Sequence, residues 1–378
     1  MTLTVRVPEV IEQALWAAAR RQLPAEVLGG AALTSAVIDR SRRYTTERDR
    51  LDAPMRPDAD LAARALFFTV ADAGKLGVPL AELVAGRAPA GFLDGDLRVL
   101  DLGAGCGAMT LGLCAFLAER AYRGRLTVTL VDHDARALAI AAAAVATVAQ
   151  ALALPCAVTT QVADVTEPRT DGPYELVVAG TVVNELAGAG AALVAAMVDV
   201  LTPGGVAIVV EPALRMTSRA LHAIRDQLIV DGRAAVLAPC TRRAAPCPAL
   251  ADERDWCHDH RPAELPPRTR QLATVTGLRD GDAKLAFLAL ARPGAAPPPP
   301  PAWRVIDDPR GQKGKHELTA CGAPGWVPVR LLRRHRSLDN RGFERCRRGD
   351  LLAIEPPPAP DATPADLTST TRVTPWPR

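Results

Sequence analysis

Residues 101–107 read Asp101-Leu102-Gly103-Ala104-Gly105-Cys106-Gly107, and this stretch decides the fold. Residues 98–102 have the pattern of a short buried strand, and residues 109–120 that of the helix after it. Glycines at such a turn let the backbone approach a ligand closely, and the helix N-terminus favours polar or anionic groups. A nicotinamide dinucleotide fingerprint would place its third glycine one position later. The pattern G-x-G-x-G therefore predicts a ligand-binding turn of another type.

Short apolar segments alternate with helical segments on either side of this turn. Strands are expected at 98–102, 126–131, 157–162, 176–179 and 206–210, with two last strands at 272–276 and 284–291. Helices are expected at 109–120, after Asp134, and at 216–230. Short buried strands that alternate with helices indicate a parallel sheet with helices on both faces. The sequence therefore predicts an α/β protein.

The glycine turn resembles the S-adenosylmethionine (SAM) loop of class I methyltransferases, which have a Rossmann-like sheet. This resemblance implies that Asp101 lies near the methionine end of the cofactor. Asp132 ends the second strand, where it can accept hydrogen bonds from ribose hydroxyls, and Asp164 fits the position that meets the adenine amino group. The predicted SAM-binding residues are Asp101, Gly103, Gly105, Gly107, Asp132 and Asp164. A fold that no longer binds a ligand is the alternative.

Acceptor-side groups are expected after the fourth strand, at residues 179–186. Asn184 and Glu185 could orient a methyl acceptor there, although an Asn-Glu pair that caps a helix explains them equally well. The Asn/Asp-Pro-Pro-aromatic motif, common where exocyclic amino groups are methylated, does not follow the fourth strand. Methyl transfer needs little more than in-line positioning of a nucleophile. The catalytic residues are therefore left unassigned.

Three of the eight cysteines, Cys240, Cys247 and Cys257, lie in a Pro- and Arg-rich stretch with little core-forming character. Zinc sites usually contain C-x2-4-C pairs, and this stretch has none. The wider spacing suits an iron–sulfur cluster whose fourth thiolate comes from elsewhere. Cys321 is the expected fourth ligand, and Cys346 is its competitor.

The same cysteines are compatible with two simpler chemistries. His258 and His260 would allow a Cys3His zinc site as a lesser alternative, and unligated surface thiols are the remaining, less favoured interpretation of the trio. The remaining cysteines in apolar surroundings are expected to be buried thiols, namely Cys106, Cys114 and Cys156.

The charge distribution along the chain is uneven although the net charge is only +3. Residues 310–348 contain eleven Lys and Arg against three Asp and Glu. A patch of one sign and this size indicates an anionic partner, with nucleic acid first among the candidates. A solvated basic face without a partner is the alternative.

The chain has 378 residues, of which 48% are hydrophobic and 23% charged, so it folds around a sizeable core. We expect a helical N-terminal region at 1–95 and a methyltransferase-like domain at 96–292 with a Cys-rich insertion at 238–267. A Pro-rich spacer is expected at 293–302, a basic β-rich module at 303–355, and a disordered tail at 356–378. The first residues do not resemble a secretory signal, so a cytoplasmic protein with reduced thiols is expected.

Five segments occur in the same order as in a known family. They are residues 101–107, 183–186, 210–212, 238–258 and 284–292. The chain resembles, over about residues 97–350, the methyltransferase-like proteins of small ribosomal subunit assembly in mitochondria and bacteria. Asp259 stands where the family has an aromatic residue, and residues 65–69 differ from its aromatic and Met-Pro features.

The resemblance implies a class I methyltransferase fold, a four-iron, four-sulfur (4Fe-4S) cluster on Cys240, Cys247, Cys257 and Cys321, and a role in maturation of the small subunit. The leading hypothesis is a SAM-dependent methyltransferase-like protein that binds ribosomal RNA through residues 310–348. A non-catalytic assembly factor with a vestigial SAM pocket is the second hypothesis. A small-molecule methyltransferase with a zinc-stapled insertion is the third.

Overall fold

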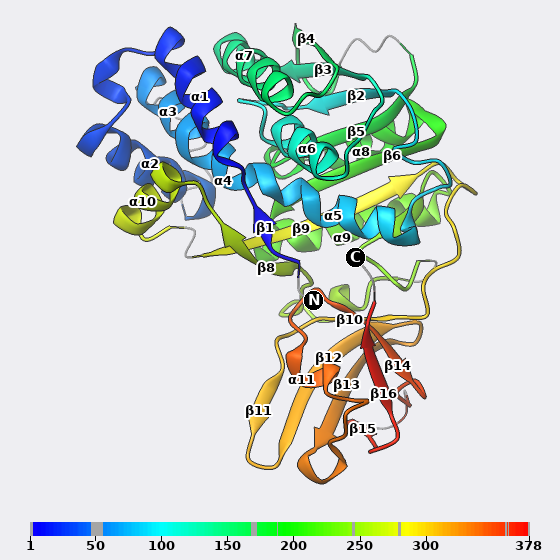
Figure 1. Cartoon of the computed structure of the whole chain (residues 1–378). Helices are drawn as coiled ribbons and strands as arrows, with labels where there is room; N and C mark the ends of the chain where they lie inside the picture. Colours follow the sequence, from blue (N-terminus) through cyan, green and yellow to red (C-terminus); the bar gives the residue numbers. More distant parts are fainter. Residues whose placement is uncertain are drawn as a thin grey trace.

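The computed structural model describes residues 3–46, 56–167, 172–186, 188–243, 246–278, 281–359, 361 and 363–376. These residues form two bodies, each built on its own sheet (Figure 1). The larger body has a nine-stranded sheet between helices, and the smaller one, at the bottom of Figure 1, has a seven-stranded, mainly antiparallel sheet.

The larger sheet has the order β1-β8-β9-β6-β5-β2-β3-β4, with β7 paired to β9. Its strands are β1 (Val5–Arg6), β2 (Leu97–Leu102), β3 (Leu126–Asp132), β4 (Cys156–Val162), β5 (Tyr174–Gly180), β6 (Leu201–Pro212), β7 (Ala235–Ala238), β8 (Asp259–Glu264) and β9 (Asp282–Ala291). Strands β2 to β6 are parallel, and the order reverses between β2 and β5, which makes the carboxyl ends of these strands the place for a ligand. β9 runs antiparallel to both β6 and β8. This confirms the predicted Rossmann-like sheet of the class I methyltransferase type.

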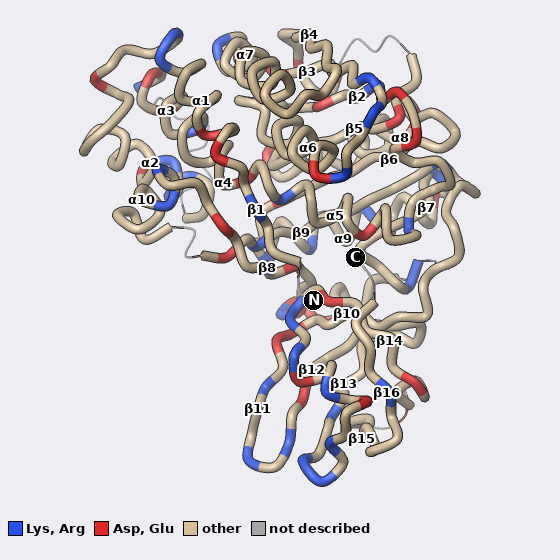
Figure 2. Tube along the Cα trace, viewed as in Figure 1, with Lys and Arg blue, Asp and Glu red and all other residues tan. Residues whose placement is uncertain are grey.

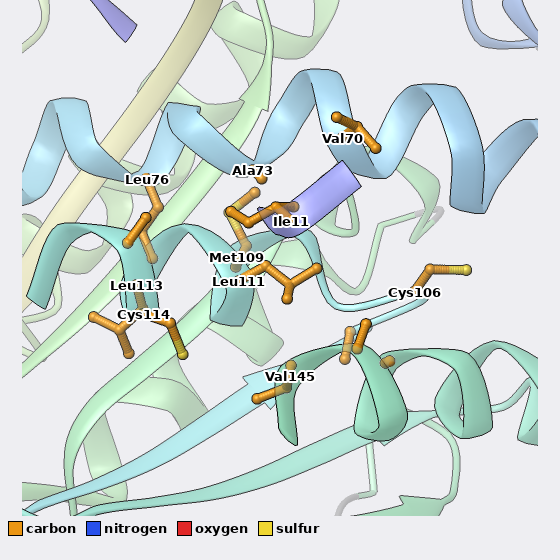
Figure 3. Packing of buried hydrophobic residues seen from close by; sticks show 14 of the residues in the cluster. Ile11, Val70, Ala73, Leu76, Cys106, Met109, Leu111, Leu113, Cys114 and Val145 are labelled. Atoms are coloured by element: carbon orange, nitrogen blue, oxygen red, sulfur yellow. The ribbon is translucent and has the colours of Figure 1, made fainter. Parts of the chain in front are cut away.

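Small and aliphatic side chains let the helices of the larger body pack closely. Helices α6 (Ala108–Glu119), α7 (Ala135–Ala151), α8 (Gly190–Asp199) and α9 (Arg215–Val230) follow β2, β3, β5 and β6. An added Cβ at Gly112 of α6 would lie 1.8 Å from the Ala73 carbonyl oxygen, so only glycine fits this crossing. Figure 3 shows apolar side chains of α6 interlocked with those of the N-terminal helices. None of the described helices is long and apolar enough to cross a membrane.

The N-terminal region is largely helical, and its helices pack against α6 and α7. Its elements are α1 (Glu9–Gln22), η1 (Ala25–Val27), α2 (Gly30–Thr45), α3 (Pro57–Ala63), η3 (Arg64–Phe68), α4 (Thr69–Ala73), η4 (Gly74–Leu76), α5 (Gly77–Glu82) and η5 (Leu83–Arg87). Helix α10 (Pro267–Thr276), although it comes much later in the sequence, packs against α1 and α2.

The strand predicted at 272–276 is wrong, because these residues belong to α10. Glu12 of α1 caps the first turn of this helix by accepting hydrogen bonds from the Thr269 amide, at 2.7 Å, and from the Arg268 amide, at 3.3 Å. On the side of β9 away from β6 lies β8, inside the stretch 238–267 that the sequence marks only as a Cys-rich insertion.

The smaller body comprises residues from 303 onward and has its own apolar core. Its elements are β10 (Trp303–Val305), β11 (Arg310–Gln312), β12 (Lys315–Gly322), β13 (Gly325–Leu332), η8 (Arg333–His335), α11 (Gly342–Arg345), β14 (Leu351–Glu355), β15 (Ala365–Leu367) and β16 (Arg372–Pro375). The sheet order is β15-β13-β12-β10-β14-β16, with β11 paired to β12.

The tail predicted to be disordered at 356–378 contains two strands of this sheet. β15 pairs with β13, and β16 pairs with β14. Leu367 and Val373 are almost fully buried in the core of the module, and Arg330 binds Asp366 through two hydrogen bonds of 2.6 and 2.9 Å. These long-range contacts order a segment whose Pro- and Thr-rich composition favours a loop.

Candidate functional site

The three glycines of the turn have the left-handed backbone that their residue type permits. Gly103, Gly105 and Gly107 have φ values of +68°, +52° and +92°. A Cβ at Gly103 would lie 2.2 Å from Cγ2 of Val182, in the loop after β5, whereas a Cβ at Gly105 would meet no atom within 4 Å. One glycine is therefore needed for packing, and the next leaves an open face at the carboxyl edge of the sheet.

Asp101 lies at the base of the turn and is fully buried. Its Oδ2 accepts a hydrogen bond of 2.7 Å from the Thr110 hydroxyl. Its Oδ1 has no hydrogen-bond partner among the described residues. Burial raises the pKa of Asp101 to about 6. An ammonium group such as that of SAM would satisfy the second oxygen and favour the carboxylate, so the turn fits this cofactor.

Asp132 is the last residue of β3 and Asp164 lies two residues after β4, at the same edge as the turn. Asp132 braces the turn, because its Oδ2 accepts a hydrogen bond of 2.8 Å from the Gly105 amide and its Oδ1 one of 2.9 Å from the Asp134 amide. Asp164 is exposed and accepts from the amide and hydroxyl of Thr166 at 2.8 and 2.6 Å. The six residues predicted to bind SAM therefore share one edge, with Asp132 already bound to the glycine backbone.

The acceptor-side loop, residues 181–186, is held by a carboxylate of the family-like segment 210–212, to which the sequence assigned no role. Glu211, near the end of β6, accepts hydrogen bonds from the Val182 amide (3.2 Å), the Asn184 amide (3.4 Å) and the Asn184 side chain (2.6 Å). Asn184 and Glu185 lie in the short helix η6 (Val183–Glu185). The Asn184 amide group is thus directed at Glu211.

Part of the N-terminal region covers this edge, although its sequence carries no recognisable motif. Arg64 of η3 forms an ion pair with Asp134, just after β3. Tyr44 of α2 packs edge-on against Phe68, with ring centroids 5.2 Å apart. Burial raises the pKa of Tyr44, and the charge of Glu185 contributes to this shift. Helix α2 therefore ends close to the acceptor-side loop.

The thiols of the four predicted cluster ligands interact electrostatically, because the charge of one raises the pKa of another. Burial raises the pKa of the Cys257 thiol, and the charges of Cys247, Cys321 and Cys240 raise it further. Burial and the charge of Cys240 raise the pKa of Cys247 and Cys321 to about 12. The backbones also meet, since the Thr241 hydroxyl donates a hydrogen bond of 3.1 Å to the Cys321 carbonyl.

The competing ligands point elsewhere. Cys346 lies in the core of the module, where its thiol is 3.1 Å from the Phe343 carbonyl, and no cysteine contributes to its raised pKa. The His258 ring stacks on Trp256 with centroids 4.0 Å apart. His260 lies 2.9 Å from Asp282. Within the described ranges, no three His, Cys, Asp or Glu side chains are arranged to hold a metal ion as they stand.

Arginines hold the backbone of the Cys-rich insertion, which includes the short helix η7 (Pro248–Leu250). Arg219 of α9 donates to three carbonyls, those of Ala249, Asp252 and Asp255, each at 2.6 Å. Arg87 donates to the Cys240 carbonyl, also at 2.6 Å. From the same face of α9, His222 Nε2 accepts a hydrogen bond of 3.2 Å from the Cys257 amide. In the sequence, the only sign of these arginine–backbone hydrogen bonds is the arginine content of the segments involved.

Arginine side chains beside the four thiols provide positive charge and N–H donors, which favour the thiolate form. The Nε atoms of Arg242 and Arg243 are buried and have no hydrogen-bond partner among the described residues. The positive charge of Arg242 acts to lower the pKa of the Cys321 thiol, and the charge of Cys240 acts to raise the pKa of Arg243. The buried Nε donors of two arginines beside four thiols would be satisfied by an anionic cluster, so these residues are chemically compatible with an iron–sulfur group.

Arg304 of β10 joins the module to the larger body. Its guanidinium is 2% exposed and binds Glu82 of α5 at 2.6 Å, Asp259 of β8 at 3.2 Å, and the carbonyls of Pro239 and Gly349 at 2.9 and 2.7 Å. One buried cation thus connects the N-terminal region, the insertion and the module.

The module separates its cations into paired and unpaired sets. Of the eleven Lys and Arg in residues 310–348, five are held by partners, namely Arg310, Lys315, Arg330, Arg336 and Arg348. Six exposed cations form no ion pair with a described residue, namely Lys313, Arg333, Arg334, Arg341, Arg345 and Arg347. Lys and Arg gather at the tip of the β11–β12 hairpin and around η8 (Figure 2). The unpaired cations are those available to an anionic partner.

Sequence comparison matches residues 95–350 to the family described as mitochondrial small ribosomal subunit Rsm22. No curated protein matches the chain. Magnesium protoporphyrin IX methyltransferase of Synechocystis is 15% identical, with 68% of this chain and 99% of that chain covered and a TM-score of 0.36. The N-methyltransferase NodS of Bradyrhizobium japonicum is 14% identical, with 69% and 98% covered and a TM-score of 0.32. The fold assignment rests on the order and direction of strands β2 to β6.

Proposed function

The chain belongs to the Rsm22 family of mitochondrial small ribosomal subunit proteins, and on this premise we propose that it is a SAM-dependent methyltransferase-like factor that binds the small ribosomal subunit or its RNA during assembly. One observation carries the proposal: a class I methyltransferase sheet with an open glycine turn is fixed, through Arg304 and the Cys-rich insertion, to a module with unpaired cations. A SAM site and an RNA-binding surface would then move as one body.

SAM binding is supported by the open face at Gly105 and the unpartnered, buried oxygen of Asp101. Isothermal titration with SAM tests it. Asp132→Ala should abolish measurable binding, because it removes the carboxylate that braces the turn and would meet the ribose. Asp199→Ala, which removes an exposed acid paired with Arg233, is the matched control and should bind as the wild type does. Absence of binding by the wild-type protein would refute this part of the proposal.

A structural 4Fe-4S cluster on Cys240, Cys247, Cys257 and Cys321 is supported by the electrostatic interaction of the four thiols and by the buried Nε atoms of Arg242 and Arg243. When bound, the cluster would supply four strong metal–thiolate bonds that hold the insertion to β12. Protein purified without oxygen should show a broad brown absorption shoulder. Cys240→Ser should lose iron and become sensitive to protease, whereas Cys346→Ser should keep its iron. A colourless protein with one zinc and no association with ribosomes would instead support the small-molecule methyltransferase.

RNA binding is supported by the six unpaired cations. The affinity for small-subunit RNA should fall steeply with salt, and each lost phosphate contact should reduce the slope of log K against log[salt] by about 1. Arg333→Ala should lower the slope in this way. Arg330→Ala, which removes an arginine already paired with Asp366, should leave it nearly unchanged. Equal effects of the two changes would contradict this assignment.

A non-catalytic assembly factor is the second candidate, and one observation favours it. The side-chain amide of Asn184, an acceptor-side candidate, is directed at Glu211, which leaves Glu185 as the other candidate. Transfer of a tritiated methyl group from SAM to small subunits distinguishes the two functions. Labelled RNA supports the enzyme, and SAM binding without labelling supports the binding factor.

The compartment is part of the same proposal. The family description names the mitochondrial small subunit, whereas the N-terminal sequence led to an expectation of the cytoplasm. A mitochondrial small subunit and a cytoplasmic small subunit would both offer the same kind of partner, a folded polyanionic RNA. Cell fractionation followed by sedimentation decides between them, because the protein should co-sediment with small subunits from only one compartment.

A further inference from the structure

Glu211 is a buried carboxylate at the ligand edge of the sheet, and the function proposed above gives it no role. It is 1% exposed and near the end of β6, beside the acceptor-side loop 181–186. Its Oε1 accepts hydrogen bonds from the Val182 and Asn184 amides, and its Oε2 accepts one from the Asn184 side chain. Three N–H groups of one loop therefore converge on one side chain of the neighbouring strand.

The loop has a backbone conformation that its own sequence disfavours. Thr181, its first residue, has a φ of +62°, in the left-handed region that β-branched residues rarely adopt. Such a residue is strained and persists only where its surroundings impose it. Here β6 imposes it, because the Thr181 amide donates a 2.8 Å hydrogen bond to the Val210 carbonyl and Glu211 binds the next turn of chain.

The loop contacts the glycine turn directly. Val182 fills the space beside Gly103 so completely that a Cβ there would lie 2.2 Å from its Cγ2. On the other side, a Cβ at Gly190 would lie 2.8 Å from Cγ1 of Val183. The two valines are wedged between the turn and the start of α8, so a change in the loop changes the support of the turn.

We propose that Glu211 is a positioning residue of the SAM site: it fixes the strained loop 181–186 so that Val182 supports the glycine turn in its ligand-binding shape. The role rests on the SAM binding proposed above and acts through Val182, since the hydrogen bonds that Glu211 accepts from Val182 and Asn184 all come from the loop. It also gives Asn184 a different task from the one predicted, because its amide braces the loop instead of gripping a methyl acceptor.

The hydrogen-bond pattern allows a sharp test. In Glu211→Gln, one oxygen can still accept from the backbone amides, but the new NH2 group faces the NH2 group of Asn184, so the two side chains can pair only if the Asn184 amide leaves its native orientation and rotates by 180°. If the loop then keeps its native shape only a tenth of the time, the Kd for SAM rises about tenfold. Glu12→Gln is the matched control, because Glu12 is also buried and accepts from an amide and a hydroxyl of Thr269, but it braces α10.

The double variant Glu211→Gln/Asn184→Asp exchanges donor and acceptor and restores the pairing, because the glutamine NH2 group then donates to the aspartate. Isothermal titration should give a Kd about tenfold higher for Glu211→Gln, and values within about threefold of wild type for Glu12→Gln and the double variant. The role is overturned if Glu211→Gln binds SAM as the wild type does, or if the double variant binds as weakly as Glu211→Gln. If the wild type itself does not bind SAM, the proposed function fails, and this role fails with it.

Discussion

Replacing Arg304 by methionine should destabilise the folded protein by about 3 kcal/mol and loosen the basic module. Methionine keeps most of the side-chain volume, so the loss reports the charge and its hydrogen bonds and not a cavity. Arg304 is 2% exposed and binds Glu82 and Asp259, whose side chains are 0% and 2% exposed. Removing one partner of a buried ion pair typically costs about 3–5 kcal/mol, because a buried charge is left behind.

The structure places the expected loss at the lower end of that range. Glu82 keeps its bond to Arg87 at 3.0 Å, and Asp259 keeps Arg261 at 2.8 Å. Neither carboxylate is therefore left without a cation. The carbonyls of Pro239 and Gly349 lose a charged donor, which adds to the loss.

Urea unfolding measures this loss, and Arg330→Met is the matched control. Arg330 binds Asp366 through two hydrogen bonds, but the side chains are 28% and 42% exposed, so its removal should cost at most about 1 kcal/mol. The Arg304→Met midpoint should fall by about 1 M or more. Limited subtilisin digestion should then cut the 293–302 spacer in Arg304→Met only. A loss below about 1 kcal/mol for Arg304→Met, or equal digestion of the two variants, would refute the reasoning.

Three further predictions follow from the same structure. Gly103→Ala should abolish SAM binding in titration, because the new Cβ would meet Val182 at 2.2 Å in a backbone that alanine disfavours; unchanged affinity would contradict the packing described here. Asp101 has its pKa raised by burial from 3.8 to about 6, so the folded state retains a proton that the unfolded chain has released, and stability present at low pH is lost as the pH rises through about 6. Asp101→Asn should remove about 2 kcal/mol of this pH dependence in urea unfolding between pH 4 and 7, and an unchanged pH profile would show that Asp101 does not cause it. Deleting residues 356–378 should make the module protease-sensitive, because β15 and β16 contribute Leu367 and Val373 to its core; a resistant truncated module would restore the prediction of a disordered tail.

Local patterns allowed the ligand-binding half of the sheet to be predicted. Strands β2, β3, β4, β5 and β6 were each recognisable from a short apolar run, and the glycine turn marked where the first one ends. The strand predicted at 272–276 was wrong because an apolar segment of that length suits a helix as well as a strand. The helix at these residues is capped by Glu12, which is 257 residues away from Thr269 along the chain.

The candidate site also contains residues that local patterns could predict and contacts that they could not. Asp101, Asp132 and Asp164 could be placed from their positions at strand ends, but the brace at Glu211 could not, since it depends on how the end of β6 meets the loop after β5. The four cysteines could be singled out by composition and family resemblance. The buried arginine Nε atoms beside them became visible only in three dimensions.

The sequence by itself determined the type of sheet, the position of its ligand edge and the concentration of cations in one module. Each of these depends on residues that are neighbours along the chain, where apolar runs, glycine torsion angles and like charges act over a few positions. Only the tertiary structure decided what holds the two bodies together, what braces the acceptor-side loop and that the tail is part of a sheet. These features depend on single hydrogen bonds and ion pairs between distant segments, and their energies exist only once the chain has buried both partners away from water.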